Sequence, residues 1–272
     1  MYKIVRRENL NSTVTLFEVE APDIAKRCKP GQFIILRVDE FGERIPLTIA
    51  SYDAEKGTIT IIFQVVGLST RKLNALQTGD YILDFVGPLG KPSDIEGLKK
   101  VCIVVGGVGS AIGYPLAREL KRCGAYVDTV LGFRTKDLII LEDDFHKISN
   151  NLYLVTDDGS AGQKGLVTDV LKELLKTEKY DVVYAIGPLV MMKYVALLGK
   201  EYEQRTIVSM NPIMIDGTGM CGGCRLTING EIKFACVDGP EFDAFGIDFD
   251  EAIQRSKIYQ KEEREADCRL GV

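Results

Sequence analysis

Histidine and tryptophan are almost missing from this chain of 272 residues, which has one histidine, His146, and no tryptophan. The chain therefore has almost none of the histidines that a Ser-His-Asp hydrolase or a histidine-rich zinc enzyme requires. No apolar run reaches the about 18 residues of a membrane-spanning helix, and the N-terminus lacks the apolar core of a signal peptide. We therefore expect a cytoplasmic protein that does not contact a membrane.

An excess of positive charge is also missing. The chain has 34 basic and 39 acidic residues, which gives a formal net charge of −5 at pH 7. We expect no nucleic-acid or anionic-membrane partner, because such partners attract basic surfaces. The composition, 46% hydrophobic and 27% charged, is typical of a globular protein, and the length allows two modest domains and an appendage.

The cysteine pattern of a secreted protein is not there either. Seven is an odd number, and four of the cysteines are scattered, which argues against a disulfide framework. The scattered ones are Cys28, Cys102, Cys123 and Cys268. The other three lie close together near the C-terminus, at Cys221, Cys224 and Cys236.

Changes in sequence pattern divide the chain into four segments. Residues 1–98 contain short β-type runs between turn signals, which predicts a closed antiparallel β-barrel. Over 99–210, buried-type strands alternate with helical patterns, which predicts a doubly wound parallel α/β domain. Residues 211–245 are rich in glycine and cysteine and interrupt this alternation, and 246–272 are charged and predicted to form a C-terminal helix.

The clustered cysteines predict an iron–sulfur site. The stretch reads Asp216-Gly-Thr-Gly-Met-Cys221-Gly-Gly-Cys224, and Cys236 follows after eleven further residues. Plant-type [2Fe–2S] sites use Cys-x4-Cys-x2-Cys and a distant fourth cysteine. Here Asp216 takes the first place, and a carboxylate can bind iron. We expect a [2Fe–2S] cluster on these four residues; a redox CxxC, a zinc site, or Cys268 in place of Asp216 are the alternatives.

Two stretches of the first segment suit a flavin. The first, Arg44-Ile-Pro46-Leu47-Thr48, combines a guanidinium that can bind pyrophosphate with open backbone for the ring edges. The second, Gly67-Leu-Ser69-Thr70, precedes a predicted short helix, and a helix N-terminus attracts anions. An edge strand with an exposed arginine and an ordinary helix cap are the alternatives.

Three strand ends of the second segment suit a pyridine nucleotide. Gly106-Gly107-Val108-Gly109 ends a buried strand and opens a helix, so a phosphate can approach its backbone. Asp157 and Asp158, after a later strand, would bond a ribose 2′-hydroxyl and repel a 2′-phosphate, which favours NAD(H) over NADP(H); a solvated turn is the alternative. Gly187-Pro188 would leave room for the nicotinamide.

In their order along the chain, these motifs resemble the ferredoxin–NADP⁺ reductase superfamily. The C-terminal cysteine segment resembles the electron-transfer subunit of dihydroorotate dehydrogenase B, and resembles more closely the small subunit of the NADH-dependent reduced ferredoxin:NADP⁺ oxidoreductases. The second resemblance rests on Asp216–Arg225 and on Phe234–Phe242. The orotate subunit would be expected to show cysteine at position 216, so Asp216 separates the two.

The resemblance implies a set of cofactors and partners. A small subunit of that family carries FAD and a [2Fe–2S] cluster, exchanges hydride with NAD(H) through its flavin without a catalytic protein residue, and forms a heterodimer. The larger flavoprotein subunit carries a second FAD and [4Fe–4S] clusters, handles NADPH and ferredoxin, and performs electron bifurcation. The alternatives are the electron-transfer subunit of dihydroorotate dehydrogenase B or of a sulfide/polysulfide oxidoreductase, and a zinc-stabilised binding module on a reductase-like scaffold.

Overall fold

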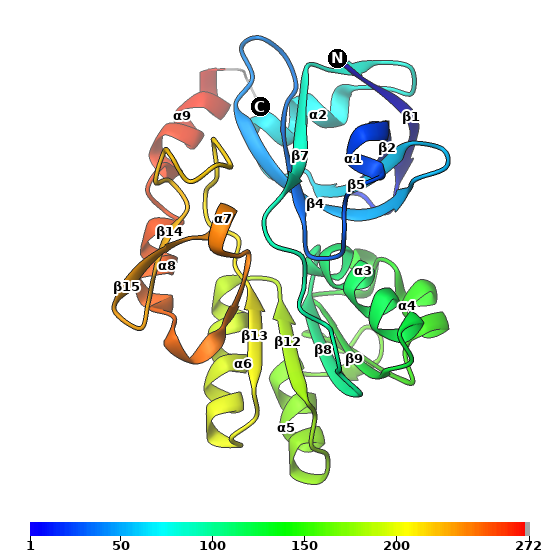
Figure 1. Cartoon of the computed structure of the whole chain (residues 1–272), viewed down its shortest axis with the longest axis vertical. Coiled ribbons are helices and arrows are strands. Elements are labelled where there is room, and N and C mark those ends of the chain that lie inside the picture. Colours follow the sequence, from blue (N-terminus) through cyan, green and yellow to red (C-terminus); the bar gives the residue numbers. More distant parts are fainter. Residues whose placement is uncertain (270–272) are drawn as a thin grey trace.

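The computed structural model describes residues 1–269, apart from the side chains of residues 264 and 267–269. Figure 1 shows a barrel of strands above a second, twisted sheet with helices on both sides, and the C-terminal segment along one side of both. Within the described residues each of the two large sheets has seven strands, and a separate hairpin has two.

The N-terminal sheet is a nearly closed antiparallel barrel, as predicted. Its strand order is β6-β1-β2-β5-β4-β3-β7, and each strand is antiparallel to its neighbours. The strands are β1 (Tyr2–Asn9), β2 (Val14–Glu20), β3 (Phe33–Arg37), β4 (Arg44–Asp53), β5 (Thr58–Gln64), β6 (Tyr81–Ile82) and β7 (Asp84–Leu89). Two short helices, α1 (Pro22–Ala25) and α2 (Leu68–Ala75), belong to the same layer.

Strand β3 is buried on both faces, which explains its continuous apolar sequence. Successive side chains of a strand point to opposite faces. Ile34 and Leu36 belong to the core inside the barrel. Phe33 and Ile35 belong to a second core, which also contains Met214 and the two cysteines Cys224 and Cys236. The outer face of β3 therefore supports the C-terminal segment.

The second sheet is parallel except at one edge, with the order β11-β10-β9-β8-β12-β13-β16. The strand order reverses between β8 and β12, and such a switch point is where α/β sheets bind ligands at their carboxyl ends. The elements are β8 (Lys100–Gly106), α3 (Gly109–Arg122), β9 (Tyr126–Phe133), the 3₁₀ turn η1 (Lys136–Leu138), α4 (Glu142–Ile148), β10 (Asn151–Thr156), β11 (Gln163–Lys164), α5 (Val167–Thr177), β12 (Val182–Ile186), α6 (Leu189–Glu201) and β13 (Thr206–Ser209).

The C-terminal segment forms a hairpin and short helices. Strands β14 (Arg225–Ile228) and β15 (Glu231–Phe234) are joined by Asn229-Gly230, whose positive φ angles suit a tight hairpin turn. Helix α7 (Ala235–Asp238) follows. Strand β16 (Glu241–Asp243) then pairs antiparallel with β13, and the 3₁₀ turn η2 (Ala244–Gly246) leads into the last helices.

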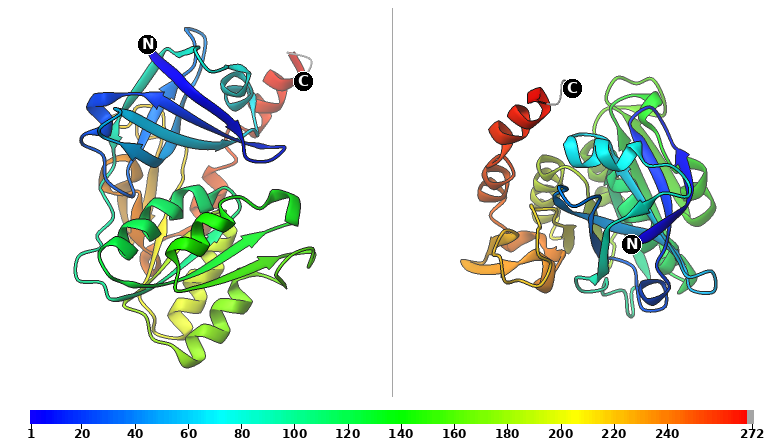
Figure 2. Two further views of the ribbon diagram at one scale, coloured as in Figure 1. Left: turned by 90° about the vertical axis from the view of Figure 1, so that its right-hand side faces the viewer. Right: turned by 90° about the horizontal axis from the view of Figure 1, so that it is seen from above.

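The last segment differs from the expected single helix. It consists of α8 (Phe249–Arg255) and α9 (Gln260–Arg269), with a turn at 256–259 between them. The break changes the course of the chain, so that α9 reaches α2 of the barrel while α8 packs against α6 (Figure 2). None of the helices described combines the length and the apolar character that crossing a membrane would require.

Candidate functional site

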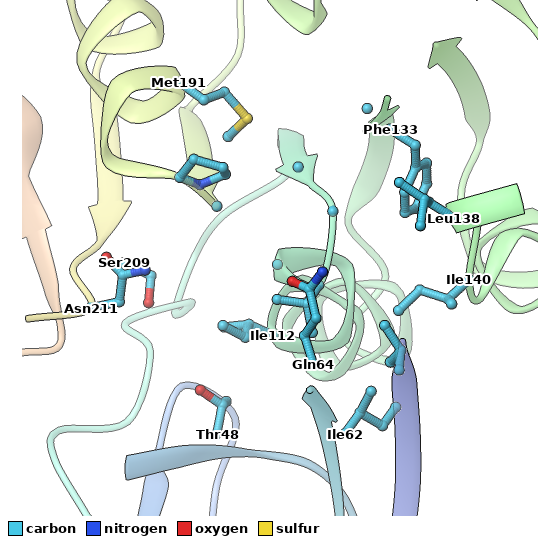
Figure 3. A pocket seen from close by; sticks show the side chains of 18 of the residues that line it. Thr48, Ile62, Gln64, Ile112, Phe133, Leu138, Ile140, Met191, Ser209 and Asn211 are labelled. Carbon is cyan, nitrogen blue, oxygen red and sulfur yellow. The ribbon is translucent and has the colours of Figure 1, made fainter. Parts of the chain in front are cut away.

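A cavity of about 940 Å³ lies between the barrel and the carboxyl ends of the parallel strands. Figure 3 shows side chains from both layers turned into it: Thr48 and Gln64 from the barrel, and Met191, Ser209 and Asn211 from the opposite side. Its volume is at the upper end of the range for ligand pockets. A ligand the size of a dinucleotide therefore fits the space between the two domains.

The barrel contributes strand β4 to this cavity. Pro46, Leu47 and Thr48, which the sequence assigns to a flavin, all line it. Proline is tolerated here although it donates no main-chain hydrogen bond, because β4 pairs with β3 through Ile45 and Leu47 on either side of it. The strand thus presents a hydroxyl and open backbone to the cavity.

The turn after β8 brings glycine backbone to the cavity. Gly106, Gly107 and Gly109 line it. Gly109 also makes a close approach: a Cβ there would lie 2.5 Å from the carbonyl oxygen of Ile186, at the end of β12. Gly107 has a φ of 56°, and a Cβ there would meet no described atom within 4 Å. The turn is therefore packed on one side and open toward the cavity, at the N-terminus of α3, where a phosphate is favoured.

Two further predicted strand ends reach the same cavity. Gly187 and Pro188 lie between β12 and α6, and Asp157 follows β10; all three line the cavity. The neighbouring Asp158 is engaged within its own turn, where its carboxylate accepts hydrogen bonds from the main-chain N–H of Ser160 at 2.9 Å and from its hydroxyl at 2.6 Å. Of the two aspartates, Asp157 is the one that lines the cavity.

The Gly67–Thr70 motif at the start of α2 reaches the cavity only in part, unlike the stretch on β4. Thr70 lines the cavity, but its hydroxyl oxygen accepts hydrogen bonds from the N–H groups of Val66 at 3.0 Å and Gly67 at 3.1 Å, so it caps its own helix. Ser69 donates to Glu43 at 2.8 Å. Gly67 and Ser69 lie outside the cavity lining.

Arg44 also lies outside the cavity lining. Its Nε atom donates a hydrogen bond of 2.8 Å to the main-chain carbonyl of Ile215, next to Asp216. The arginine that the sequence assigns to a flavin pyrophosphate therefore contacts the predicted cluster segment.

Polar residues at two other strand ends were missed at the sequence level. Gln64 ends β5, and Ser209 ends β13 with Asn211 two residues later. The signal was available for the last two: β13 is predicted as a strand of the parallel sheet, and the carboxyl ends of such strands share one edge. The local sequence around Gln64 does not predict its place in the cavity, because the way in which the barrel closes determines which strand ends face the other domain.

The predicted cluster ligands lie on one loop and one hairpin. Cys224 precedes β14 and Cys236 follows β15, and their sulfur atoms lie 3.2 Å apart in a buried position. Burial and the adjacent Cys224 thiol raise the pKa of Cys236 to about 12. Cys221 is exposed, and its sulfur accepts a hydrogen bond from the N–H of Gly223 at 3.5 Å.

Asp216 organises the loop that carries Cys221. Its carboxylate accepts hydrogen bonds from the N–H groups of Thr218 at 3.0 Å and Met220 at 3.1 Å. The Thr218 N–H, then the Thr218 hydroxyl, and to a smaller extent the Met220 N–H lower the pKa of Asp216. The residue is therefore a charged oxygen donor, as a metal ligand in this place would be.

The donor set suits a thiolate-bound metal centre, although only part of it is assembled. Two thiolates on one tetrahedral metal at about 2.3 Å stand roughly 3.8 Å apart, close to the Cys224–Cys236 spacing. Main-chain N–H groups reach sulfur at Cys221 and Cys224, as iron–sulfur sites require. Among the described side chains, however, no group of three or more possible ligands converges on one point. The side chain of Cys268, the alternative fourth ligand, lies outside the described residues.

Comparison with known proteins places the cysteine segment in a family. Residues 211–248 match the model of the iron–sulfur cluster binding domain of dihydroorotate dehydrogenase B. Over 96% of the chain and 93% of the relative, the sequence is 48% identical to a dihydroorotate dehydrogenase B (NAD⁺) electron-transfer subunit homologue of Thermotoga maritima.

Solved structures extend the comparison. One, described as giving insight into flavin-based electron bifurcation in an NADH-dependent reduced ferredoxin–NADP oxidoreductase, is 46% identical, covers 100% of this chain and 98% of its own, and superposes with a TM-score of 0.95. Phthalate dioxygenase reductase, 19% identical with a TM-score of 0.60 over 73% of this chain and 63% of its own, shares the fold alone.

These comparisons confirm both resemblances of the sequence, to the orotate subunit and to the ferredoxin–NADP oxidoreductase subunit. The predicted fold, a flavin-reductase barrel followed by an α/β nucleotide domain and an iron–sulfur segment, is confirmed. The predicted cofactors, FAD, a [2Fe–2S] cluster and NAD(H), are confirmed at the level of the family. The chain belongs to the family of dihydroorotate dehydrogenase B electron-transfer subunits and their homologues.

Proposed function

We propose that this chain is the FAD- and [2Fe–2S]-containing small subunit of an electron-bifurcating, ferredoxin-dependent NAD(P)⁺ transhydrogenase. In this role it exchanges hydride with NAD(H) and single electrons with a larger flavoprotein subunit. The flavin supplies the conversion between a hydride and single electrons, and the cluster supplies a one-electron site. The partner would carry a second FAD and [4Fe–4S] clusters and handle NADPH and ferredoxin.

Asp216 is the observation that carries the proposal. It occupies the first place of the Cys-x4-Cys-x2-Cys pattern, where the orotate subunit would be expected to have cysteine. The similarity to the ferredoxin–NADP oxidoreductase structure over the whole chain supports the same assignment. We assign the cluster to Asp216, Cys221, Cys224 and Cys236.

The cavity supports a role for each layer. We assign Pro46, Leu47 and Thr48 on β4, with Thr70, to the flavin, since they line the cavity from the barrel side. Gly67 and Ser69 stay in this assignment as the residues around the N-terminus of α2. The chain's work toward the flavin is to bind and orient it, and no protein acid or base is required.

The α/β layer would hold the pyridine nucleotide. We assign the pyrophosphate to Gly106, Gly107 and Gly109, whose turn is open toward the cavity. Asp157 would accept hydrogen bonds from the adenosine ribose, and Gly187-Pro188 would make room for the nicotinamide. The cavity joins both layers, so the two ligands would meet within it.

A second candidate is the electron-transfer subunit of dihydroorotate dehydrogenase B. The match of residues 211–248 to that enzyme's iron–sulfur domain favours it. Sulfide oxidation or polysulfide reduction with another partner is a variant of the same electron-transfer role.

Co-purification with the partner decides between these assignments. The tagged chain, expressed with its neighbouring genes, should bring down a flavoprotein with [4Fe–4S] clusters. With NADPH as donor, that complex should reduce ferredoxin and NAD⁺ together. A complex that instead reduces NAD⁺ with dihydroorotate, and leaves ferredoxin oxidised, would contradict the proposal and support the second candidate.

A further inference from the structure

We propose that Arg44 is a positioning residue for the iron–sulfur site: it ties the flavin-binding strand β4 to the cluster loop, residues 215–223. This inference rests on the proposed function, because it assigns a second task to a residue of the flavin barrel. It concerns the distance and orientation between the two redox sites of the chain.

The first contact is the hydrogen bond from Arg44. Its Nε atom donates to the carbonyl oxygen of Ile215 at 2.8 Å, across 171 positions of the sequence. Ile215 directly precedes Asp216, so the bond holds the main chain at the first predicted ligand. Arg44 is half-buried and Ile215 is exposed, so this bond lies at the edge of the contact between the barrel and the loop.

The second contact lies on the other side of Asp216. Gly217 is buried with a φ of 86°, and a Cβ there would lie 2.8 Å from Leu89 Cδ1 and 2.9 Å from Ile35 Cδ1. Both partners belong to the barrel, on β7 and β3. The cluster loop therefore sits against the barrel at a point where only glycine fits.

The two contacts enclose Asp216 from both directions along the chain. Its carboxylate then fixes the rest of the loop by accepting hydrogen bonds from Thr218 and Met220. The barrel thus determines where this end of the cluster site lies. On the same strand, two residues after Arg44, Pro46 begins the stretch that lines the flavin cavity.

The hydrogen bond to Ile215 uses the Nε–H of the Arg44 guanidinium, which is held in the plane of a rigid fork of five donors. Arg44 lies outside the cavity lining, so the contact that the structure shows is the one to the cluster loop. Lysine would not reproduce this contact, since a flexible ammonium lacks the fixed planar donor.

The test compares Arg44→Met and Arg44→Lys with Arg37→Met in the purified complex. Arg37 is a matched control, because it pairs directly with Arg44 in the β3–β4 register and bonds Asp84 at 2.8 Å on the barrel. Measured quantities are FAD and iron per chain, the EPR spectrum of the reduced cluster, and its midpoint potential.

Both Arg44 variants should shift the EPR spectrum and the midpoint potential or lose iron, whereas Arg37→Met should keep the wild-type values. Gly217→Ala, which displaces the loop from the other side, should produce the same kind of change without a contact to the flavin.

A variant Arg44→Met with wild-type iron, spectrum and potential would overturn the inference, whether or not FAD is lost. If Arg44→Met fails to fold, Arg44→Lys takes its place, because it keeps the positive charge. Wild-type iron content, EPR spectrum and midpoint potential in Arg44→Lys would then overturn the inference. Wild-type protein without flavin or without a cluster would instead overturn the proposed function itself.

Discussion

The sulfur atoms of Cys224 and Cys236 lie 3.2 Å apart, although eleven residues separate them in the chain. The β14–β15 hairpin brings them together, because Arg225 pairs with Phe234 and the two cysteines flank this last pair. The hairpin is a local element, and it places two of the predicted ligands side by side. The other two places of the site depend on the loop at Asp216 and on its contact with the barrel.

Replacing Asp216 by cysteine should change the cluster without removing it. Asp216→Cys restores the plant-type ligand pattern and exchanges a hard oxygen donor for a more covalent thiolate, so the midpoint potential should shift. EPR-monitored redox titration measures this. Asp243→Asn is a suitable control, since that carboxylate caps the following turn by accepting a hydrogen bond from the N–H of Phe245. An unchanged spectrum and potential in Asp216→Cys would mean that Asp216 is not a ligand.

Adding one methyl group at Gly109 should weaken nucleotide binding. The new Cβ would lie 2.5 Å from the carbonyl oxygen of Ile186, so the turn must move, at a cost of about 1–3 kcal/mol of stability. Gly113→Ala is the matched variant: its Cβ would lie 2.5 Å from Val105 Cγ1, one turn further along α3 and outside the cavity lining.

Both glycine variants should lower the thermal unfolding temperature, but only Gly109→Ala should also raise the dissociation constant for NADH, measured by calorimetry. Equal NADH affinity in the two variants would argue against the assignment of the turn to the pyrophosphate.

Removing the charge of Asp157 should relax the preference for NADH. A carboxylate in the cavity repels a 2′-phosphate, so Asp157→Asn should increase the ratio of NADPH to NADH affinity. In Asp158→Asn the ratio should change little, because that carboxylate is engaged with Ser160. Steady-state reduction of an artificial acceptor with each nucleotide gives the ratio. If the nucleotide preference changed in Asp158→Asn and not in Asp157→Asn, the ribose contact would belong to Asp158.

Glu241 should make the stability of the chain depend on pH. Burial of this side chain on β16 raises the pKa of its carboxyl from 4.5 to about 7, and Ser93 donates a hydrogen bond to it at 2.6 Å. The folded chain then holds a proton that the unfolded chain releases at lower pH. The contribution of Glu241 to the free energy of unfolding is fully present below pH 4.5 and is lost as the pH rises through about 7.

Urea unfolding at a series of pH values tests this linkage. Glu241→Gln should flatten the fall in the free energy of unfolding between mildly acidic and neutral pH. Glu201→Gln, at the exposed end of α6, should keep the wild-type dependence. Identical pH profiles for Glu241→Gln and wild type would show that Glu241 does not titrate in this range.

The sequence predicts the elements of this fold better than their contacts. Val101–Val105 is identifiable as a buried strand because its apolar run is local, and the glycines after it mark the turn. The β14–β15 hairpin was not predicted, although its Asn229-Gly230 turn is a strong local hairpin signal.

Contacts between segments that are distant in the chain could not be predicted from the sequence, for a physical reason. Arginine is the residue expected at a pyrophosphate, and nothing near Arg44 in the sequence indicates that its Nε atom bonds the carbonyl of Ile215. In the same way, the apolar run of β3 predicts a strand, but not that Phe33 and Ile35 face the cysteine segment. Both contacts depend on how the barrel and the C-terminal segment pack, which local propensity does not encode.

Anaerobic titration of the purified chain with NADH, followed by visible absorbance and EPR together with iron, zinc and FAD analysis, tests the central claim most directly. We expect bound FAD that bleaches on reduction, two irons per chain as in a [2Fe–2S] cluster, and a single cluster EPR signal that appears with the bleaching. A chain that contains zinc instead of iron and shows no flavin absorbance would contradict it.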